Sequence, residues 1–170
     1  MVAAPDRRDA PLSASRYDLQ VRFLKTSIIQ ASAADVFSFH ERPDALARLT
    51  PPWQKTEIVQ APSSLEVGTR VVLRTRIGPL RQTIVAEHVE YERGHMFADR
   101  MIEGPFARWL HRHIVTPAGE GACTLTDDID YELPLGVLGR VFGAAIARRQ
   151  LERLFTFRHE VTRLACEPAR

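Results

Sequence analysis

Hydrophobic and polar residues alternate in seven segments of the chain, a pattern typical of β-strands that bury one face. The first segment runs from about Leu19 to Gln30 and carries Val21 and Phe23 at alternate positions. Six more strands are predicted, at residues 56–60, 69–77, 80–91, 97–102, 107–116 and 123–133. The alternation slips at Glu87-His88, which indicates a β-bulge in that strand.

Helical patterns occupy two other parts of the chain. Ser32 stands three residues before Asp35, a start similar to a capping box, and this helix is expected to end before Pro43. A second short helix, which the Asp44 side chain can cap, is predicted to run through Leu49. After the seventh strand, apolar residues at helical spacing predict one long helix over residues 135–165. These apolar residues are Val141, Ala144, Leu151, Leu154, Phe155, Val161 and Ala165.

The order of these elements indicates an α+β fold. One strand, two short helices, six strands and one long helix are expected to form a single curved antiparallel sheet of about seven strands around the C-terminal helix. Both the sheet and the helix have an apolar face, and the sheet must curl around the helix to bury both. Residues 19–166 are expected to form this domain. Residues 1–18, with their Pro, Ala, Asp and Arg content, are expected to be a flexible N-terminal tail.

Ionisable residues interrupt the apolar faces of the last two strands. His111 and His113 share one face of the sixth strand with Trp109, because side chains alternate along a strand. Asp127 interrupts the corresponding face of the seventh strand. The other residues of that face are Leu125, Ile129, Tyr131 and Leu133. A hairpin closed near Gly119 sets Asp127 opposite His111 or His113, so the pattern predicts a buried carboxylate that is hydrogen-bonded to an imidazole.

Three residues outside these strands are also candidates for a binding site. Arg158 lies on the apolar stripe of the long helix, between Phe155 and Val161. A buried guanidinium needs a carboxylate or a ligand oxygen as its partner, unless it reaches solvent at the rim. His40 and Trp53 flank the two short helices, where each either packs or gates access to the interior.

Composition narrows the functional classes. The chain has 170 residues, of which 45% are hydrophobic and 26% charged, and its formal net charge is +2. This small charge, without a basic run interleaved with aromatic residues, argues against a nucleic-acid partner. No apolar run approaches the ~20 residues of a membrane span. Cys123 and Cys166 are too few for a disulfide framework, so a reducing, cytoplasmic location is expected.

Three segments carry a resemblance to a known family. They are FADRMIEGPFARWLHRH, TLTDDIDYELPLGVLG and LERLFTFRHEV, which contain a Gly-Pro-Phe turn, a Trp-x-His-x-His strand, a Thr-x-Leu-x-Asp strand and a late Phe-x-x-Arg. The chain resembles the SRPBCC superfamily (START and Bet v 1-like, with the helix-grip fold), and in particular a bacterial branch similar to the polyketide cyclase/dehydrase groups. Relatives of this branch also occur fused to sugar-nucleotide epimerase-like domains. The resemblance covers about residues 19–164.

The resemblance implies a cavity between the sheet and the long helix that holds a hydrophobic or amphipathic small molecule. A lipid-like, polyketide-like or aromatic-like ligand would fit this description. The residues agree, because a mostly apolar wall with a few polar groups is typical of small-molecule sites. The expected ligand-binding residues are Trp109, Tyr131, Arg158, Asp99, Phe155, His40 and Trp53.

Binding without catalysis is the preferred hypothesis, and an enzyme of the cyclase or dehydratase type is the alternative. In that case His111, His113 and Asp127 are the expected catalytic residues. One histidine would act as general base, Asp127 would fix its tautomer, and Arg158 or Tyr131 would stabilise an enolate oxygen. The same histidines also fit a buried structural network without turnover.

A metal site is the remaining hypothesis for these residues. His-x-His on one strand face, with Asp127 opposite, supplies three ligands of types that zinc accepts. Such pairs arise often by chance, so the sequence predicts neither a metal ion nor another cofactor. Besides the small molecule, the possible partners are a second copy of the chain and a partner enzyme.

Overall fold

The computed structural model describes residues 20–77 and 80–168. The flexible tail expected at residues 1–18 lies outside the described residues. The side chains of residues 137–142, which include Val141 of the predicted apolar stripe, are also outside the description. Among the described helices, none combines the length and the apolar character needed to cross a membrane.

The predicted order of elements is confirmed in the described part of the chain. Its strands are β1 (Val21–Ile29), β2 (Glu57–Gln60), β3 (Arg70–Ile77), β4 (Leu80–Glu92), β5 (Met96–Glu103), β6 (Arg108–Pro117) and β7 (Cys123–Glu132). Its helices are α1 (Ala33–Glu41), α2 (Ala45–Arg48) and α3 (Gly136–Cys166). The fold class is therefore α+β, as the alternation of apolar residues predicted.

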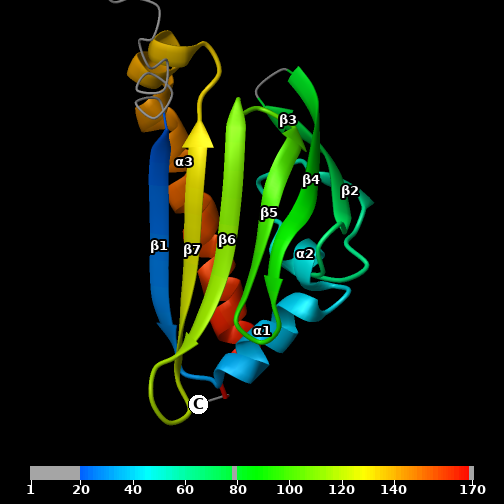
Figure 1. Cartoon of the computed structure of the whole chain (residues 1–170), viewed down its shortest axis with the longest axis vertical. Coiled ribbons are helices and arrows are strands. Elements are labelled where there is room, and N and C mark those ends of the chain that lie inside the picture. Colours follow the sequence, from blue (N-terminus) through cyan, green and yellow to red (C-terminus); the bar gives the residue numbers. More distant parts are fainter. Residues whose placement is uncertain (1–19, 78–79, 169–170) are drawn as a thin grey trace, which may run out of the picture.

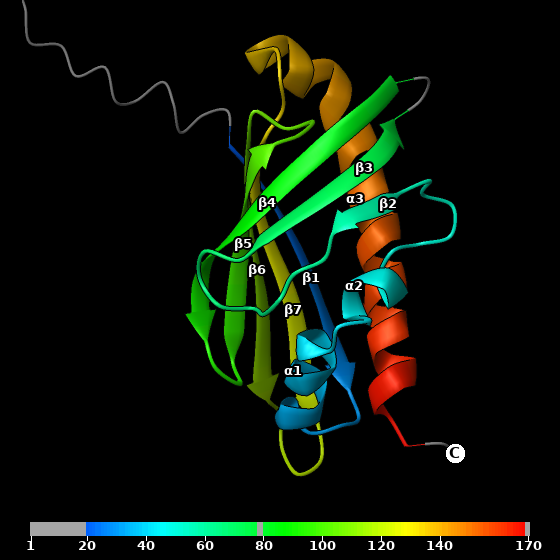
Figure 2. The ribbon, with the colours of Figure 1, turned by 90° about the vertical axis from the view of Figure 1, so that its right-hand side faces the viewer.

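The strands form one antiparallel sheet in the order β1-β7-β6-β5-β4-β3-β2. The first strand pairs with the last, so α1 and α2 carry the chain from one edge of the sheet to the other. The sheet curls around one side of α3, and α1 lies between the sheet and the C-terminal part of α3 (Figures 1 and 2). Helix α3 packs mainly on β1, β7 and α1, which leaves the concave face of β3, β4 and β5 outside its main contacts.

The register of the sheet aligns ionisable residues of neighbouring strands. His113 of β6 pairs with Asp127 of β7, and Asp99 of β5 pairs with His111 of β6. The hairpin register predicted for Asp127 is therefore confirmed with His113 as the opposite residue. The predicted bulge is also present, since the register between β4 and β5 shifts directly after His88.

Local interactions fix the starts of the helices. Ser32 Oγ accepts a hydrogen bond of 3.1 Å from the backbone N–H of Asp35, so the predicted cap of α1 is confirmed. Asp44 occupies the N-cap position of α2, but its carboxylate binds the Arg42 guanidinium and caps no helix N–H. The predicted capping role of Asp44 is therefore wrong, because a neighbouring cation competes for the same oxygens. Helix α3 begins after Leu135, whose φ of 66° is left-handed.

A buried stripe of α3 seals the core against the sheet. Leu151, Phe155, His159 and Thr162 are buried and recur at the spacing of one helix face. The Phe155 side chain is fully buried, and its ring centroid lies 5.7 Å from that of Phe23 on β1. Apolar side chains of β7 complete this cluster, so the core lies between α3, β1 and β7.

We expect Phe155→Ala to destabilise the protein by about 3–5 kcal/mol, because it removes a fully buried ring and leaves a cavity between α3 and β1. Ile146→Ala is the matched control on the same helix, since Ile146 is 61% exposed. Its effect should stay within about 0.5 kcal/mol. Urea denaturation followed by circular dichroism measures both variants, and equal losses would contradict this packing.

Candidate functional site

Three imidazole rings surround the carboxylate of Asp127. His111 Nε2 lies 2.7 Å from Oδ1 of Asp127, and His159 Nε2 lies 2.7 Å from Oδ2. His113 Nδ1 lies 2.8 Å from Oδ1. All four residues are buried. They form one group, the Asp127 cluster (His111, His113, Asp127 and His159), which joins β6, β7 and α3.

The Asp127 carboxylate is buried as an anion. Burial by itself would raise the pKa of Asp127, but charge interactions and hydrogen bonds with the imidazoles outweigh it and hold the pKa well below the usual range. An unpaired carboxylate at this depth would cost several kcal/mol. The N–H groups that compensate this cost come from β6 and α3, so the predicted hydrogen bond between Asp127 and an imidazole is confirmed.

His111 lies between two carboxylates. Its Nε2 contacts Asp127, and its Nδ1 lies 3.5 Å from Oδ2 of Asp99. Burial alone would lower the pKa of His111, but the interactions with Asp127 and Asp99 outweigh burial and raise the pKa to about 9. At neutral pH His111 therefore carries a proton on both nitrogens and has no lone pair with which to act as a base.

His113 is neutral beside the charged His111. Burial and the adjacent charge of His111 lower the pKa of His113 to about 3, although Asp127 opposes this shift. The His113 ring stacks on Phe97, with centroids 4.2 Å apart and planes inclined by 12°. His113 is thus an oriented imidazole of low basicity, held between an aromatic ring and a carboxylate.

Sequence reasoning missed His159 and selected Arg158 beside it. His159 follows Phe155 by four residues, which places it on the buried stripe of α3, and this spacing was the available signal. Its Nδ1 lies 2.7 Å from the Ser27 hydroxyl on β1, while its Nε2 bonds to Asp127. His159 therefore links the helix to two strands of the sheet.

Arg158 has a different partner from the expected ones. Its Nε donates a hydrogen bond of 3.2 Å to the backbone carbonyl of Leu49, and its guanidinium carbon lies 5.3 Å from the Phe155 ring centroid. Burial lowers the pKa of Arg158, and the charges of Asp127 and Asp99 oppose this shift. The Nε of Arg158 is thus bonded to a backbone carbonyl, while the guanidinium lies near enough to Asp127 and Asp99 to interact with their charges.

The aromatic residues predicted for the site pack beside the Asp127 cluster. Phe106 lies between Trp109 and Tyr131, with ring centroids 4.8 Å and 5.4 Å away. The Phe155 ring lies 5.0 Å from that of His111 in an edge-on arrangement. Tyr131 and Phe155 are buried and Trp109 is half-buried, so they form an apolar wall around the polar groups.

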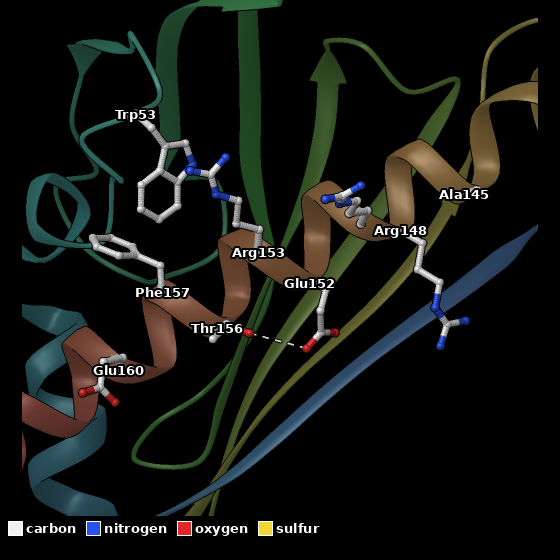
Figure 3. A pocket seen from close by; sticks show the side chains of 9 residues that line it. Trp53, Ala145, Arg148, Glu152, Arg153, Thr156, Phe157 and Glu160 are labelled. Atoms are coloured by element: carbon white, nitrogen blue, oxygen red, sulfur yellow. Dashed lines mark hydrogen bonds between the residues drawn. The ribbon is translucent and has the colours of Figure 1, made fainter.

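His40 and Trp53 lie on different sides of α3. His40 is buried, its Nδ1 is 2.8 Å from the carbonyl oxygen of Val36, and its ring lies 5.9 Å from that of His113. Trp53 packs against Phe157 and under the Arg153 guanidinium, in an open groove along the outer face of α3 (Figure 3). These helix positions lie half a turn away from the buried stripe, so Trp53 is separated from the Asp127 cluster and does not join the other predicted site residues.

Apolar side chains on the concave face of β3, β4 and β5 remain half-buried. Leu73 points inward, because Arg74 beside it on β3 is exposed. Cross-strand pairing puts Ile84 of β4 beside Leu73, and Met101 of β5 beside Ala86. Leu73, Ile84 and Met101 are all partly exposed. An apolar surface that α3 does not seal therefore adjoins the strands that carry the Asp127 cluster.

The arrangement allows two kinds of chemistry. Asp127 orients His113 as it would orient a general base, but an imidazole whose pKa is about 3 removes protons poorly at neutral pH. Asp99, His111 and His113 each offer one ligand atom, and these atoms lie within 4.8 Å of one another. This donor set has the types that zinc accepts.

Comparison with known proteins finds relatives over nearly the whole described chain. Residues 20–167 match the family described as polyketide cyclase / dehydrase and lipid transport. Among solved structures, norcoclaurine synthase from Thalictrum flavum, in complex with dopamine and hydroxybenzaldehyde, is 16% identical with a TM-score of 0.63. This match covers 95% of the present chain and 96% of the synthase. No curated protein matches the chain.

Two other solved structures have the same architecture. Major latex-like protein 151 from Panax ginseng is 17% identical with a TM-score of 0.64, over 88% of this chain and 99% of that chain. A nucleoside-diphosphate sugar epimerase from Corynebacterium glutamicum is 21% identical with a TM-score of 0.63, over 83% of this chain and 28% of the epimerase. At these identities the likeness shows the fold alone, and it confirms the Bet v 1-like helix-grip fold.

We expect the free energy of unfolding to decrease as the pH rises from about 6.5 to about 9. Folded His111 has a pKa of about 9, whereas an unfolded histidine titrates near 6.5. The folded state binds the extra proton between these values, so this contribution is fully present below pH 6.5 and is lost through pH 9. The loss should be on the order of 1–3 kcal/mol.

Urea denaturation at a series of pH values, in buffer containing EDTA, measures this dependence. His111→Gln should flatten the curve over the same window, while His95→Gln, which changes a histidine bonded to the Val115 carbonyl, should leave it unchanged. An imidazole NMR resonance of His111 that titrates near pH 6.5 in the folded protein would contradict the expectation.

Proposed function

This chain belongs to the polyketide cyclase / dehydrase and lipid transport family, and from that premise we propose that it binds a hydrophobic or amphipathic small molecule on the concave face of its sheet. The ligand is lipid-like, polyketide-like or aromatic. The observation that carries the proposal is the half-buried apolar surface of Leu73, Ile84 and Met101, beside a wall of aromatic side chains.

The composition of this surface supports a small-molecule site. Such sites combine apolar walls with a few placed polar groups that orient the ligand. Trp109 of β6, with Phe106 of the preceding turn packed against it, extends the apolar surface, and the Asp99 carboxylate supplies a charged group at its edge. Norcoclaurine synthase, which shares the fold, was solved with dopamine and hydroxybenzaldehyde, and an aromatic ligand of that size is a candidate for this chain.

An enzyme of the cyclase or dehydratase type is the second candidate. The contact of 2.8 Å between His113 Nδ1 and Asp127 favours it, because it is the contact that orients a general base. Two features weigh against it. His111 has no free lone pair, and the pKa of His113, about 3, is far below the value near 7 that suits a base at neutral pH. Binding is therefore the function that the geometry supports best.

We expect Ile84→Trp to weaken the binding of the amphipathic dye 8-anilinonaphthalene-1-sulfonate at least about tenfold, because the indole fills space on the concave face. Val85→Trp is the matched control, since neighbouring residues of a strand face opposite sides of the sheet. Fluorescence titration measures both variants. Equal effects of the two substitutions would contradict a site on the concave face.

Native mass spectrometry of freshly purified protein should also reveal a co-purified small molecule.

A solvent-exchange experiment tests the catalytic alternative. The protein is incubated with 4-phenyl-2-butanone in D₂O, and NMR follows deuterium uptake beside the ketone. We expect no exchange above background, because His111 has no free lone pair and His113 is too weak a base at neutral pH. Exchange that is lost in His113→Gln but retained in His95→Gln would favour the enzyme over the binding protein.

A further inference from the structure

We propose that Asp99, His111 and His113 form a binding site for a divalent metal ion of the zinc type, with Asp127 as the residue that positions the histidines. This inference goes beyond small-molecule binding and does not depend on it. One ligand atom from each of the three residues lies within 4.8 Å of the others. Two imidazoles and a carboxylate are ligands that Zn²⁺ accepts, and three protein ligands leave a fourth position for water or a substrate atom.

The geometry between Asp99 and His111 fits two ligands of one ion. Asp99 Oδ2 and His111 Nδ1 are 3.5 Å apart, too far for a good hydrogen bond. Two ligand atoms bound tetrahedrally at about 2.0–2.1 Å from zinc are about 3.4 Å from each other. The two side chains therefore have the spacing of groups that face a common third atom.

Two buried polar atoms without a hydrogen-bond partner lie at the proposed metal site and on the strand beside it. Among the described residues, Asp99 Oδ2 and His88 Nδ1 are the buried side-chain atoms that have no hydrogen-bond partner. Asp99 and His88 are directly paired across β4 and β5. Buried polar atoms without partners are uncommon and call for an explanation such as an ion. A metal ion would give this carboxylate oxygen a closer partner than His111 Nδ1, which lies 3.5 Å away.

Asp127 gives the site the support that metal-binding histidines usually have. A histidine ligand typically donates its second N–H to a carboxylate, which fixes the orientation of the ring. His111 contacts Asp127 through Nε2, and its Nδ1 faces Asp99. Asp127 is held in turn by His159, which contacts the Ser27 hydroxyl. This chain of contacts fixes the ring whose second nitrogen is directed toward the proposed ion.

The charges of the site allow a dication to replace the proton that His111 holds between the two carboxylates. Asp99 and Asp127 place two carboxylates around the same two rings. Binding of the ion displaces the Nδ1 proton of His111, and the two positive charges of the ion then offset the two carboxylates. Arg158 is close enough to interact with both carboxylates, but its Nε is bonded to the Leu49 carbonyl.

The metal ligands proposed from the structure differ from the three that the sequence pattern suggests. There Asp127 was the third ligand beside His-x-His, and no metal was predicted. In the structure Asp127 contacts nitrogens of both rings at 2.7–2.8 Å, so it supports the ligands and does not join them. Asp99 takes the place of Asp127 as the third ligand, because the pairing of β5 with β6 sets it directly opposite His111.

Metal titration of the full chain tests the proposal. The protein is treated with EDTA, freed of the chelator, and titrated with ZnCl₂ by calorimetry and with CoCl₂ by visible absorption. We expect one ion per chain and the strong visible bands of tetrahedral Co²⁺ with nitrogen and oxygen ligands. Asp99→Asn keeps the shape of the side chain and removes its charge, and it should weaken binding at least about tenfold. Asp130→Asn, a carboxylate elsewhere on β7, is the control and should bind as the wild type does.

Melting temperatures measured with and without zinc separate a loss of metal binding from a folding defect of the variant. Zinc should raise the melting temperature of the wild type and of Asp130→Asn, and it should not raise that of Asp99→Asn. If Asp99→Asn is unfolded in EDTA, His113→Gln replaces it with the same expectation. Absence of saturable binding by the wild type, or unchanged affinity in a folded Asp99→Asn or His113→Gln variant, would overturn the proposal.

Discussion

The arrangement of this protein depends on the compensation of one buried negative charge. The Asp127 carboxylate lies in an otherwise apolar interface between the sheet and α3, where an unpaired charge would cost several kcal/mol. Imidazole groups from β6 and from α3 provide its partners. Because His159 must reach Asp127 for this compensation, the contact also fixes where the helix lies along the sheet.

This requirement divides the concave face into two unlike parts. Beneath α3, Phe155, Leu151 and Phe23 fill the space around the Asp127 cluster, so this part serves the stability of the fold. Over β3, β4 and β5 the inward apolar side chains stay half-buried, because the helix packs mainly on β1, β7 and α1. The proposed small-molecule surface lies on this second part, and the proposed metal ligands lie where the two parts meet.

Membership of a family does not by itself select between these roles, because one fold carries many chemistries. The environments of two adjacent histidines are more informative. Two carboxylates keep His111 charged, while burial and that same charge keep His113 neutral. Neither ring offers a strong base at neutral pH, but both present nitrogens near a second carboxylate, Asp99. The pKa values of the two rings argue against proton abstraction at neutral pH, and a cation would bind there by displacing the proton of His111.

The spacing of apolar residues determined the strands and the long helix, with alternation marking the strands and a helical period marking the helix. It also determined the inward direction of His111, His113 and Asp127, because periodicity is a local property of the chain. Only the tertiary structure decided which residues from other elements meet them. His159 was hidden beside the more conspicuous Arg158. Asp99 was among the predicted site residues, but only the pairing of β5 with β6 set it directly opposite His111. Trp53 lies on the far side of α3, because the position of a loop on a helix depends on packing between distant segments. Contacts of this kind join residues far apart in sequence, and no local pattern specifies them.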